Sequence, residues 1–243
     1  MTTATRLMVA CSLALICGYS SAQGEFTRDF PLASCSFIPA RGSPYFPIVP
    51  GRQSYFSNAA CVASGQCDSL TELWITMEPD IRRIALPDKR QRPVIARVME
   101  ERETENGDLV EVSRNFIADC FPSHDVYYFG EEVDIYEGGE IVDHEGAWIA
   151  GVHGAKPGIL MPEDGFLVGS RYFQELAPGI AMDRAEHKRA GFSMRVPAGK
   201  FDDCVEVEET TPLERGTSTK VYCRGVGLVK DDDVELTAIY GGR

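Results

Sequence analysis

Short runs of alternating apolar and polar residues, separated by turn residues, constrain the fold of this chain more than any other feature. Residues 94–102 and 109–121 are two such runs, and Asn106-Gly107 lies between them. Asn-Gly between two alternating runs is the strongest short-range signal for a β-hairpin. Further runs of the same kind span residues 70–77, 126–129, 133–136, 141–143, 171–176, 180–187, 192–196, 201–208, 217–223 and 234–240.

Helical periodicity is not sustained anywhere in the sequence. Consecutive strands with short connections pair antiparallel, and a sheet of about ten to twelve strands curves or closes on itself. The sequence therefore predicts a mainly β fold, an antiparallel curved sheet or barrel-like β-sandwich. Glycine and proline are dense between Gly146 and Gly169, which predicts a long non-regular loop there, and such loops are often functional.

The first 22 residues have the features of a secretory signal peptide. Arg6 precedes the apolar run of residues 7–17, and Ser20-Ser21-Ala22 offers small residues at a cleavage site. The run is shorter than the roughly 20 apolar residues of a membrane span, and no later stretch approaches that length. We therefore expect a periplasmic or secreted protein without a membrane span, with residues 23–243 forming a single β-rich domain. Residues 23–69 are its irregular, cysteine-bearing N-terminal segment.

The chain is acidic, with a formal net charge of −13. Removing the signal peptide takes away Arg6 and no acidic residue, which makes the charge −14. A nucleic-acid-binding protein would present a basic face, and an acidic surface attracts cations instead. We therefore expect a small molecule or a cation as partner and no nucleic acid. The oligomeric state does not follow from the sequence.

Six cysteines follow the signal peptide, and an even number in an exported chain predicts disulfides. Six cysteines allow 15 pairings, so their positions in the sequence favour certain pairs without fixing the connectivity. Cys204 and Cys223 lie symmetrically in a predicted hairpin, and Cys61 and Cys67 can close a small loop. The remaining two are Cys35 and Cys120. A zinc site is disfavoured because no C-x-x-C spacing occurs.

Several blocks resemble a known family. They are GAWIAGVHGAKPGILMP at 146–162, YFQE at 172–175, GIAMDRAE at 179–186, TPLE at 211–214, GVGLV at 225–229 and SPYFPIVPG at 43–51. Together they cover most of the chain after the signal peptide and are similar to a family of exported bacterial β-rich proteins to which no function is assigned. The resemblance implies export and a β-rich fold, and it implies no catalytic residue. One departure is the cysteine-bearing loop after Tyr55-Phe56, where the family has a tryptophan or tyrosine pair soon after the Pro-Gly.

Histidines and carboxylates between residues 143 and 187 suggest a divalent metal. Imidazole and carboxylate groups suit transition metals, and the candidate ligands are His144, His153, Asp183 and His187. The alternative for His144 is a solvated strand end followed by a turn. For Asp183, strand alternation alone can place the carboxylate outside.

Three carboxylates of the same region, Glu145, Glu175 and Asp183, are candidates for catalysis. Glycoside chemistry needs two carboxyl groups that flank a bond, one of them kept protonated by its surroundings. Candidate ligand-binding side chains, including aromatic rings that could stack on a sugar, are Trp148, Tyr172 and Met161. An acidic protein offers many carboxylate pairs, so the pattern is weakly specific. No nucleophile, zinc-protease or nucleotide-binding motif occurs.

The leading hypothesis is an exported soluble protein that binds a small ligand or divalent cation near residues 144–187. One alternative is a hydrolase or lyase that uses the paired carboxylates. The other is an envelope interaction protein whose aromatic-rich segment 37–56 forms the contact surface.

Overall fold

The computed structural model describes residues 25–87, 92–163 and 166–242. The predicted signal peptide lies outside this part. The N-terminal segment forms the 3-10 helix η1 (Leu32–Ser34), the strands β1 (Ser36–Ile38), β2 (Arg41–Ser43), β3 (Phe46–Ile48) and β4 (Gln53–Ser57), and the short helix α1 (Ala59–Ala63). None of the helices in these ranges has the length and hydrophobicity that a membrane crossing requires.

Strands make up most of the remaining chain. The first group is β5 (Thr71–Ile84), β6 (Val94–Glu105), β7 (Asp108–Phe121), β8 (Asp125–Glu137), β9 (Glu140–Asp143), β10 (Trp148–Ile149) and β11 (Lys156–Met161). The second group is β12 (Arg171–Phe173), β13 (Glu175–Leu176), β14 (Arg184–Val196), β15 (Gly199–Thr210), β16 (Ser218–Cys223), β17 (Gly227–Asp231) and β18 (Val234–Tyr240). The predicted mainly β fold is confirmed.

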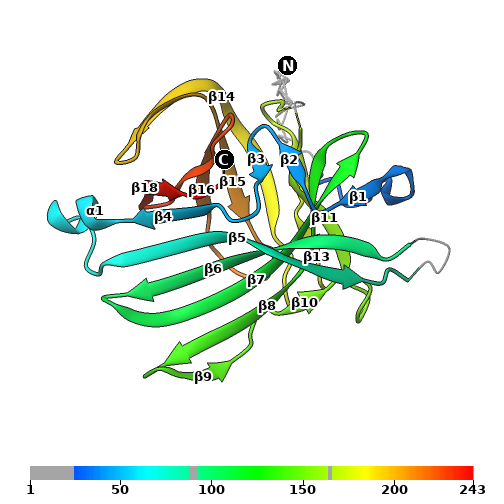
Figure 1. The fold of residues 1–243 in the computed structure, drawn as a ribbon, viewed down its shortest axis with the longest axis horizontal. Coiled ribbons are helices and arrows are strands. Elements are labelled where there is room, and N and C mark those ends of the chain that lie inside the picture. Colours follow the sequence, from blue (N-terminus) through cyan, green and yellow to red (C-terminus); the bar gives the residue numbers. More distant parts are fainter. Residues whose placement is uncertain (1–24, 88–91, 164–165, 243) are drawn as a thin grey trace, which may run out of the picture.

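The large sheet is antiparallel and almost closes into a barrel. Its main path runs β12-β14-β15-β16-β17-β18-β4-β5-β6-β7-β8-β11-β13, while β2 and β3 form a separate hairpin. In Figure 1, β5 to β8 run side by side as long strands. The two strands at the ends of this path, β12 and β13, follow each other directly in the sequence. β12 pairs with β14 at one end, and β13 pairs with β11 at the other. We call residues 171–176 the closing segment.

The hairpin predicted at Asn106-Gly107 joins β6 to β7. Both turn residues have positive φ, 51° for Asn106 and 91° for Gly107. Two-residue hairpin turns of this kind need positive φ at both positions, which Asn and Gly tolerate best. The hairpin is therefore confirmed together with its physical cause.

The glycine-rich stretch 146–169 contains two strands, β10 and β11. Gly158, in β11, lies directly against the closing segment, where an added Cβ atom would meet the carbonyl oxygen of Phe173 at 2.2 Å and that of Gln174 at 2.6 Å. The glycine thus permits a close backbone approach at the seam of the barrel.

Three disulfides cross-link the chain: Cys35–Cys120, Cys61–Cys67 and Cys204–Cys223. The last joins residues that face each other directly across β15 and β16. The predicted disulfide framework is confirmed. Disulfides form and persist in oxidising compartments, and this places the protein outside the cytoplasm.

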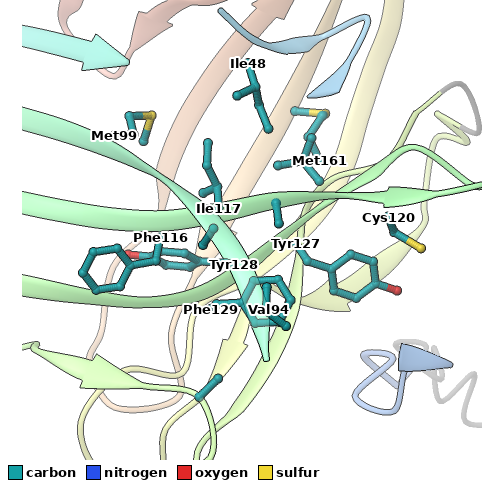
Figure 2. Close-up of a cluster of buried hydrophobic side chains, with 14 of the residues drawn as sticks. Ile48, Val94, Met99, Phe116, Ile117, Cys120, Tyr127, Tyr128, Phe129 and Met161 are labelled. Carbon is teal, nitrogen blue, oxygen red and sulfur yellow. The ribbon is translucent and has the colours of Figure 1, made fainter. Parts of the chain in front are cut away.

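Among the described residues, the buried hydrophobic side chains form two clusters, and Figure 2 shows part of the larger one, including Met99, Ile117 and Phe129. Tyr127 and Tyr128, neighbours in β8, point to opposite sides of the strand in this view. The aromatic residues of segment 37–56 contribute to the two cores: Tyr45 is 4% exposed and Phe56 is fully buried. Tyr45 and Phe56 therefore pack inside the molecule, whereas Phe37, Phe46 and Tyr55 are half-buried.

Candidate functional site

A polar cavity of about 230 Å³ lies inside the barrel. Strands β4 to β8 form one wall, β15 to β17 form the opposite wall, and the β3 residues Phe46 and Pro47 border it. Six carboxyl groups and two basic side chains line it: Glu101, Glu131, Glu175, Asp183, Glu209, Asp231, Arg52 and Lys220. So polar an interior is unusual, because charged groups lose hydration when they are buried.

Strand register explains why polar side chains of the first wall face inward. Met77 pairs with Met99, Met99 with Asn115, and Asn115 with Glu131. Residues directly opposite each other in a sheet share a face, so the buried methionines and the polar groups point into the same space. Tyr128 joins this wall and donates a short hydrogen bond to Asn115 Oδ1.

Glu101 follows Met99 on the inward face of β6 and has the same orientation because side chains alternate. Burial raises the pKa of Glu101 from its usual 4.5 to about 7. The positive charge of Lys220 opposes the rise, while the carboxylates of Asp231, Glu111 and Glu209 add to it. Glu101 therefore changes its charge near neutral pH.

Glu131, on β8, behaves like Glu101. Burial raises its pKa to about 7, the nearby Tyr128 hydroxyl opposes the shift, and nearby carboxylates such as Glu101 and Glu111 add to it. Two carboxyl groups on the same wall thus titrate in the physiological range.

The opposite wall holds a buried ion-pair network centred on Lys220. Its Nζ lies 2.8 Å from Glu209 Oε2 and 3.7 Å from Asp231 Oδ2. Burial alone would lower the pKa of Lys220, but the charges of Glu209 and Asp231 outweigh it and raise this pKa well above its usual value. Glu209 also accepts a 2.8 Å hydrogen bond from the amide Nε2 of Gln174.

Glu175 and Asp183 meet at the seam of the barrel. Glu175, in β13, is 2% exposed, and its Oε1 accepts a 2.5 Å hydrogen bond from the backbone N–H of Asp183. Burial, with the nearby charge of Asp183, raises the pKa of Glu175 well above its usual value despite this hydrogen bond. Asp183 is exposed in part, and desolvation where it lines the cavity raises its pKa too.

The cavity has a mouth beside the loop of residues 211–217, which connects β15 to β16. A second hollow of about 400 Å³ is lined by this loop and shares Asp183, Glu209, Lys220 and Asp231 with the cavity. These four residues therefore stand between the interior and the surface, so a ligand entering here would first meet charged groups.

Arg52 also lines the cavity, near the turn that precedes β17. Its Nη1 donates a 3.0 Å hydrogen bond to the carbonyl oxygen of Val226. Its Nε is buried and has no hydrogen-bond partner among the described residues. Burial lowers the pKa of Arg52, although a guanidinium stays charged in proteins.

The four predicted metal ligands do not come together. His144 is exposed and its Nδ1 lies 2.6 Å from the carbonyl oxygen of Val133. His153 is exposed in a turn, whereas His187 is 1% exposed and stacks on Phe166 with ring centroids 3.8 Å apart. Burial lowers the pKa of His187 to about 4. Of these four predicted residues, Asp183 lines the cavity.

Potential metal-ligating atoms converge at a different place in the molecule. Within residues 25–87, 92–163 and 166–242, a single group of three His, Cys, Asp or Glu residues has its ligand atoms within 4.8 Å of one another. The group consists of Cys61, Cys67 and Asp233. Both cysteines are held in a disulfide, which removes the thiolates that would bind a metal.

The other predicted residues are divided between the cavity and the core. Glu175 and Asp183 line the cavity, whereas Glu145 is exposed in the turn before β10. Trp148, Tyr172 and Met161 are buried and lie outside the cavity lining. Trp148 and His153 border a separate groove of about 240 Å³.

Several cavity residues were not predicted, among them Glu101, Glu131 and Lys220. The alternation of side chains along each strand could have identified them, because residues two positions apart face the same side of the sheet. Glu101 is two residues after the buried Met99, and Lys220 is two residues before the buried Tyr222. A charged residue in phase with core residues is a candidate for an interior polar site.

Comparison with known proteins gives weak likenesses. No family model and no curated protein matches this chain. One similar solved structure is a protein described as exported, with a YmcC-like fold, from Bacteroides fragilis NCTC 9343. It is 15% identical, the alignment covers 85% of this chain and 100% of that one, and the TM-score is 0.31. A second, described as a lipoprotein from Parabacteroides distasonis ATCC 8503, is 12% identical over 82% and 99% of the two chains with a TM-score of 0.28. Likenesses this weak carry no conclusion about fold family or activity.

Proposed function

We propose that this protein is an extracytoplasmic binding protein that holds a small hydrophilic ligand in the acidic cavity of its barrel. The observation that carries the proposal is a cavity of about 230 Å³ whose walls bring together six carboxyl groups, including Glu101 and Glu131. Largely preformed concave sites with a few converging polar groups are the usual form of small-molecule sites.

The energetics of the cavity support this proposal. Burial of carboxyl groups without complete pairing costs stability, and perturbed pKa values gather at functional sites more often than elsewhere. Glu101, Glu131 and Glu175 all have pKa values raised by burial. A ligand that supplies hydrogen-bond donors or positive charge would offset this cost. Binding such a ligand would therefore explain why the cavity contains buried carboxyl groups.

The proposal is tested by measuring the melting temperature against a panel of small amines, amino acids, polyols and sugars. A ligand that binds only the folded state stabilises it by about 2.7 kcal/mol at a hundredfold excess over Kd, and the melting temperature rises accordingly. We expect a hit that Glu131→Gln weakens and that Glu140→Gln, an exposed carboxylate on β9, leaves unchanged. The proposal fails if no compound shifts the melting temperature, or if the shift survives changes at both Glu101 and Glu131.

A second candidate function is a hydrolase or lyase, because Glu175 and Asp183 lie together beside the mouth of the cavity. A buried carboxyl group with a raised pKa next to a more exposed carboxylate suits general acid and base chemistry. Incubation with chromogenic glycosides tests it: turnover should disappear in Glu175→Gln and in Asp183→Asn, both of which should still fold. Recovery of every bound compound unchanged, judged by mass spectrometry, would favour binding alone.

A further inference from the structure

We propose that the ligand is an extended organic diamine or polyamine, and that its ammonium groups pair with separate carboxylates along the cavity. The proposal rests on the proposed function, since it names the chemical class that the same cavity accepts. Three features support it: the charge of the lining, the spacing of the carboxylates, and the apolar side chains that line the same cavity.

The charge of the cavity favours a cation. Lys220 pairs with Glu209 and Asp231. In the part of the chain that the structure describes, Glu101, Glu131, Glu175 and Asp183 form no ion pair within 4.0 Å; the pairs present there involve other residues. Ionised carboxylates only accept hydrogen bonds. A ligand with N–H donors and positive charge would therefore complement these four groups.

The spacing of the carboxylates disfavours a metal ion. Oxygen atoms at about 2.4 Å from one calcium ion lie within about 4.8 Å of one another. Among the described residues, no three carboxylates of the cavity meet that condition. The carboxylates are instead distributed over β6, β8, β13, β15 and β17 and the chain just before β14. Separate positive charges on one flexible molecule can reach carboxylates that a single ion cannot bridge.

Apolar side chains line the cavity together with the carboxylates and suit the methylene groups of such a ligand. Ile75, Met77, Met99 and Leu160 line the same cavity, and so do the aromatic rings of Tyr128 and Tyr222. Aromatic faces attract ammonium groups, and methylene groups gain from burial against apolar surface. The space suits a small molecule: a water molecule occupies about 30 Å³, so 230 Å³ corresponds to about eight non-hydrogen atoms. A six-carbon diamine has about that many.

The test is isothermal titration calorimetry on the full protein after removal of its signal peptide, with six probes at equal ionic strength. The probes are hexamethylenediamine, the matching six-carbon diol, hexylamine, and the chlorides of magnesium, calcium and zinc. We expect the diamine to bind and the diol to bind at least tenfold more weakly. Loss of one charged hydrogen bond corresponds to about a 10- to 100-fold loss of affinity, which is also the effect expected for Glu101→Gln and for Glu131→Gln.

The outcomes separate this proposal from the one on which it rests. Equal binding of diol and diamine would overturn the amine proposal and leave a hydrophilic-ligand site in place. Equal binding of hexylamine would overturn the need for two positive ends, and binding of metal chlorides alone would overturn the organic ligand. If the diamine bound as tightly to Glu101→Gln and Glu131→Gln as to the matched control Glu140→Gln, the cavity would be the wrong site. No binding by any probe would overturn the amine proposal, and the wider panel would then decide the proposed function.

Discussion

At the scale of single residues, the protein keeps carboxyl groups where burial disfavours their charge. Glu101 illustrates the conflict, because it occupies an inward position next to Met99 and yet carries an ionisable group. Glutamate at this position stabilises the protein less than a neutral side chain of the same shape would. Natural proteins accept such a cost mainly where the group has a function.

Glu101→Gln should raise stability at neutral and alkaline pH. Burial raises the pKa of Glu101 from 4.5 to about 7, so between these values the folded protein holds a proton that the unfolded chain has released. The contribution of Glu101 to stability therefore falls as pH rises through this window. Removing the charge should stabilise the protein by about 2 kcal/mol, or roughly 4–8 °C, at about pH 8.

Thermal denaturation followed by circular dichroism between about pH 4 and pH 8 measures this effect. The gain of Glu101→Gln over the natural protein should vanish toward pH 4, where both side chains are neutral. The control Glu140→Gln should follow the natural protein at every pH, because Glu140 is exposed. A Glu101→Gln protein that melts lower than the natural one at high pH would show that the ionised carboxylate is paired, and would contradict the account.

At the scale of elements, the seam of the barrel depends on a strand with one position that has no side chain, Gly158 in β11. Strand β11 passes so close to the closing segment that only glycine fits at position 158. Strand β13 then positions Glu175 at the cavity, so the same contact that closes the sheet also fixes a candidate site residue.

Gly158→Ala should destabilise the protein, by about 2 kcal/mol or more, because the new methyl group would overlap two backbone carbonyl groups that cannot move aside cheaply. Urea denaturation measures the loss. Gly216→Ala is the matched control, since an added Cβ atom there meets nothing within 4 Å, and it should change stability by less than about 0.5 kcal/mol. Equal stability of the two variants would mean that the seam is looser than described.

Local rules predicted the elements better than they predicted the site. Turn chemistry at Asn106-Gly107 and strand alternation in residues 70–77 depend on neighbouring residues, and the structure confirms both. The sequence pattern did not predict strand β11, because its one glycine, Gly158, serves a backbone contact with the closing segment. The sequence did not predict the cavity for a similar reason. Glu101 and Lys220 come from opposite walls, and only the order of strands in the nearly closed sheet brings them to the same cavity.

At the scale of the whole molecule, three disulfides close loops of very different length. Cys35–Cys120 spans 85 positions and connects the N-terminal segment to β7, while Cys61–Cys67 spans 6. A disulfide stabilises the folded state mainly by restricting the unfolded chain, and the effect grows with the logarithm of the loop length. The long-range link should therefore contribute most to the stability of the whole molecule.

Replacing Cys35 and Cys120 together by alanine should cost about 4.5 kcal/mol on this basis, and replacing Cys61 and Cys67 about 2 kcal/mol. Burial of Cys120 in the core adds a packing loss in the same direction. Guanidinium denaturation of the two double variants measures which of them loses more stability. The natural protein under oxidising conditions is the reference. A larger loss for the Cys61–Cys67 variant would indicate that the loop after α1 and the contact of Cys67 with Asp233 stabilise the barrel more than the N-terminal tether does. The expected order instead leaves α1 a local feature at the edge of the barrel, and makes the link between the N-terminal segment and β7 the main covalent support of the cavity wall.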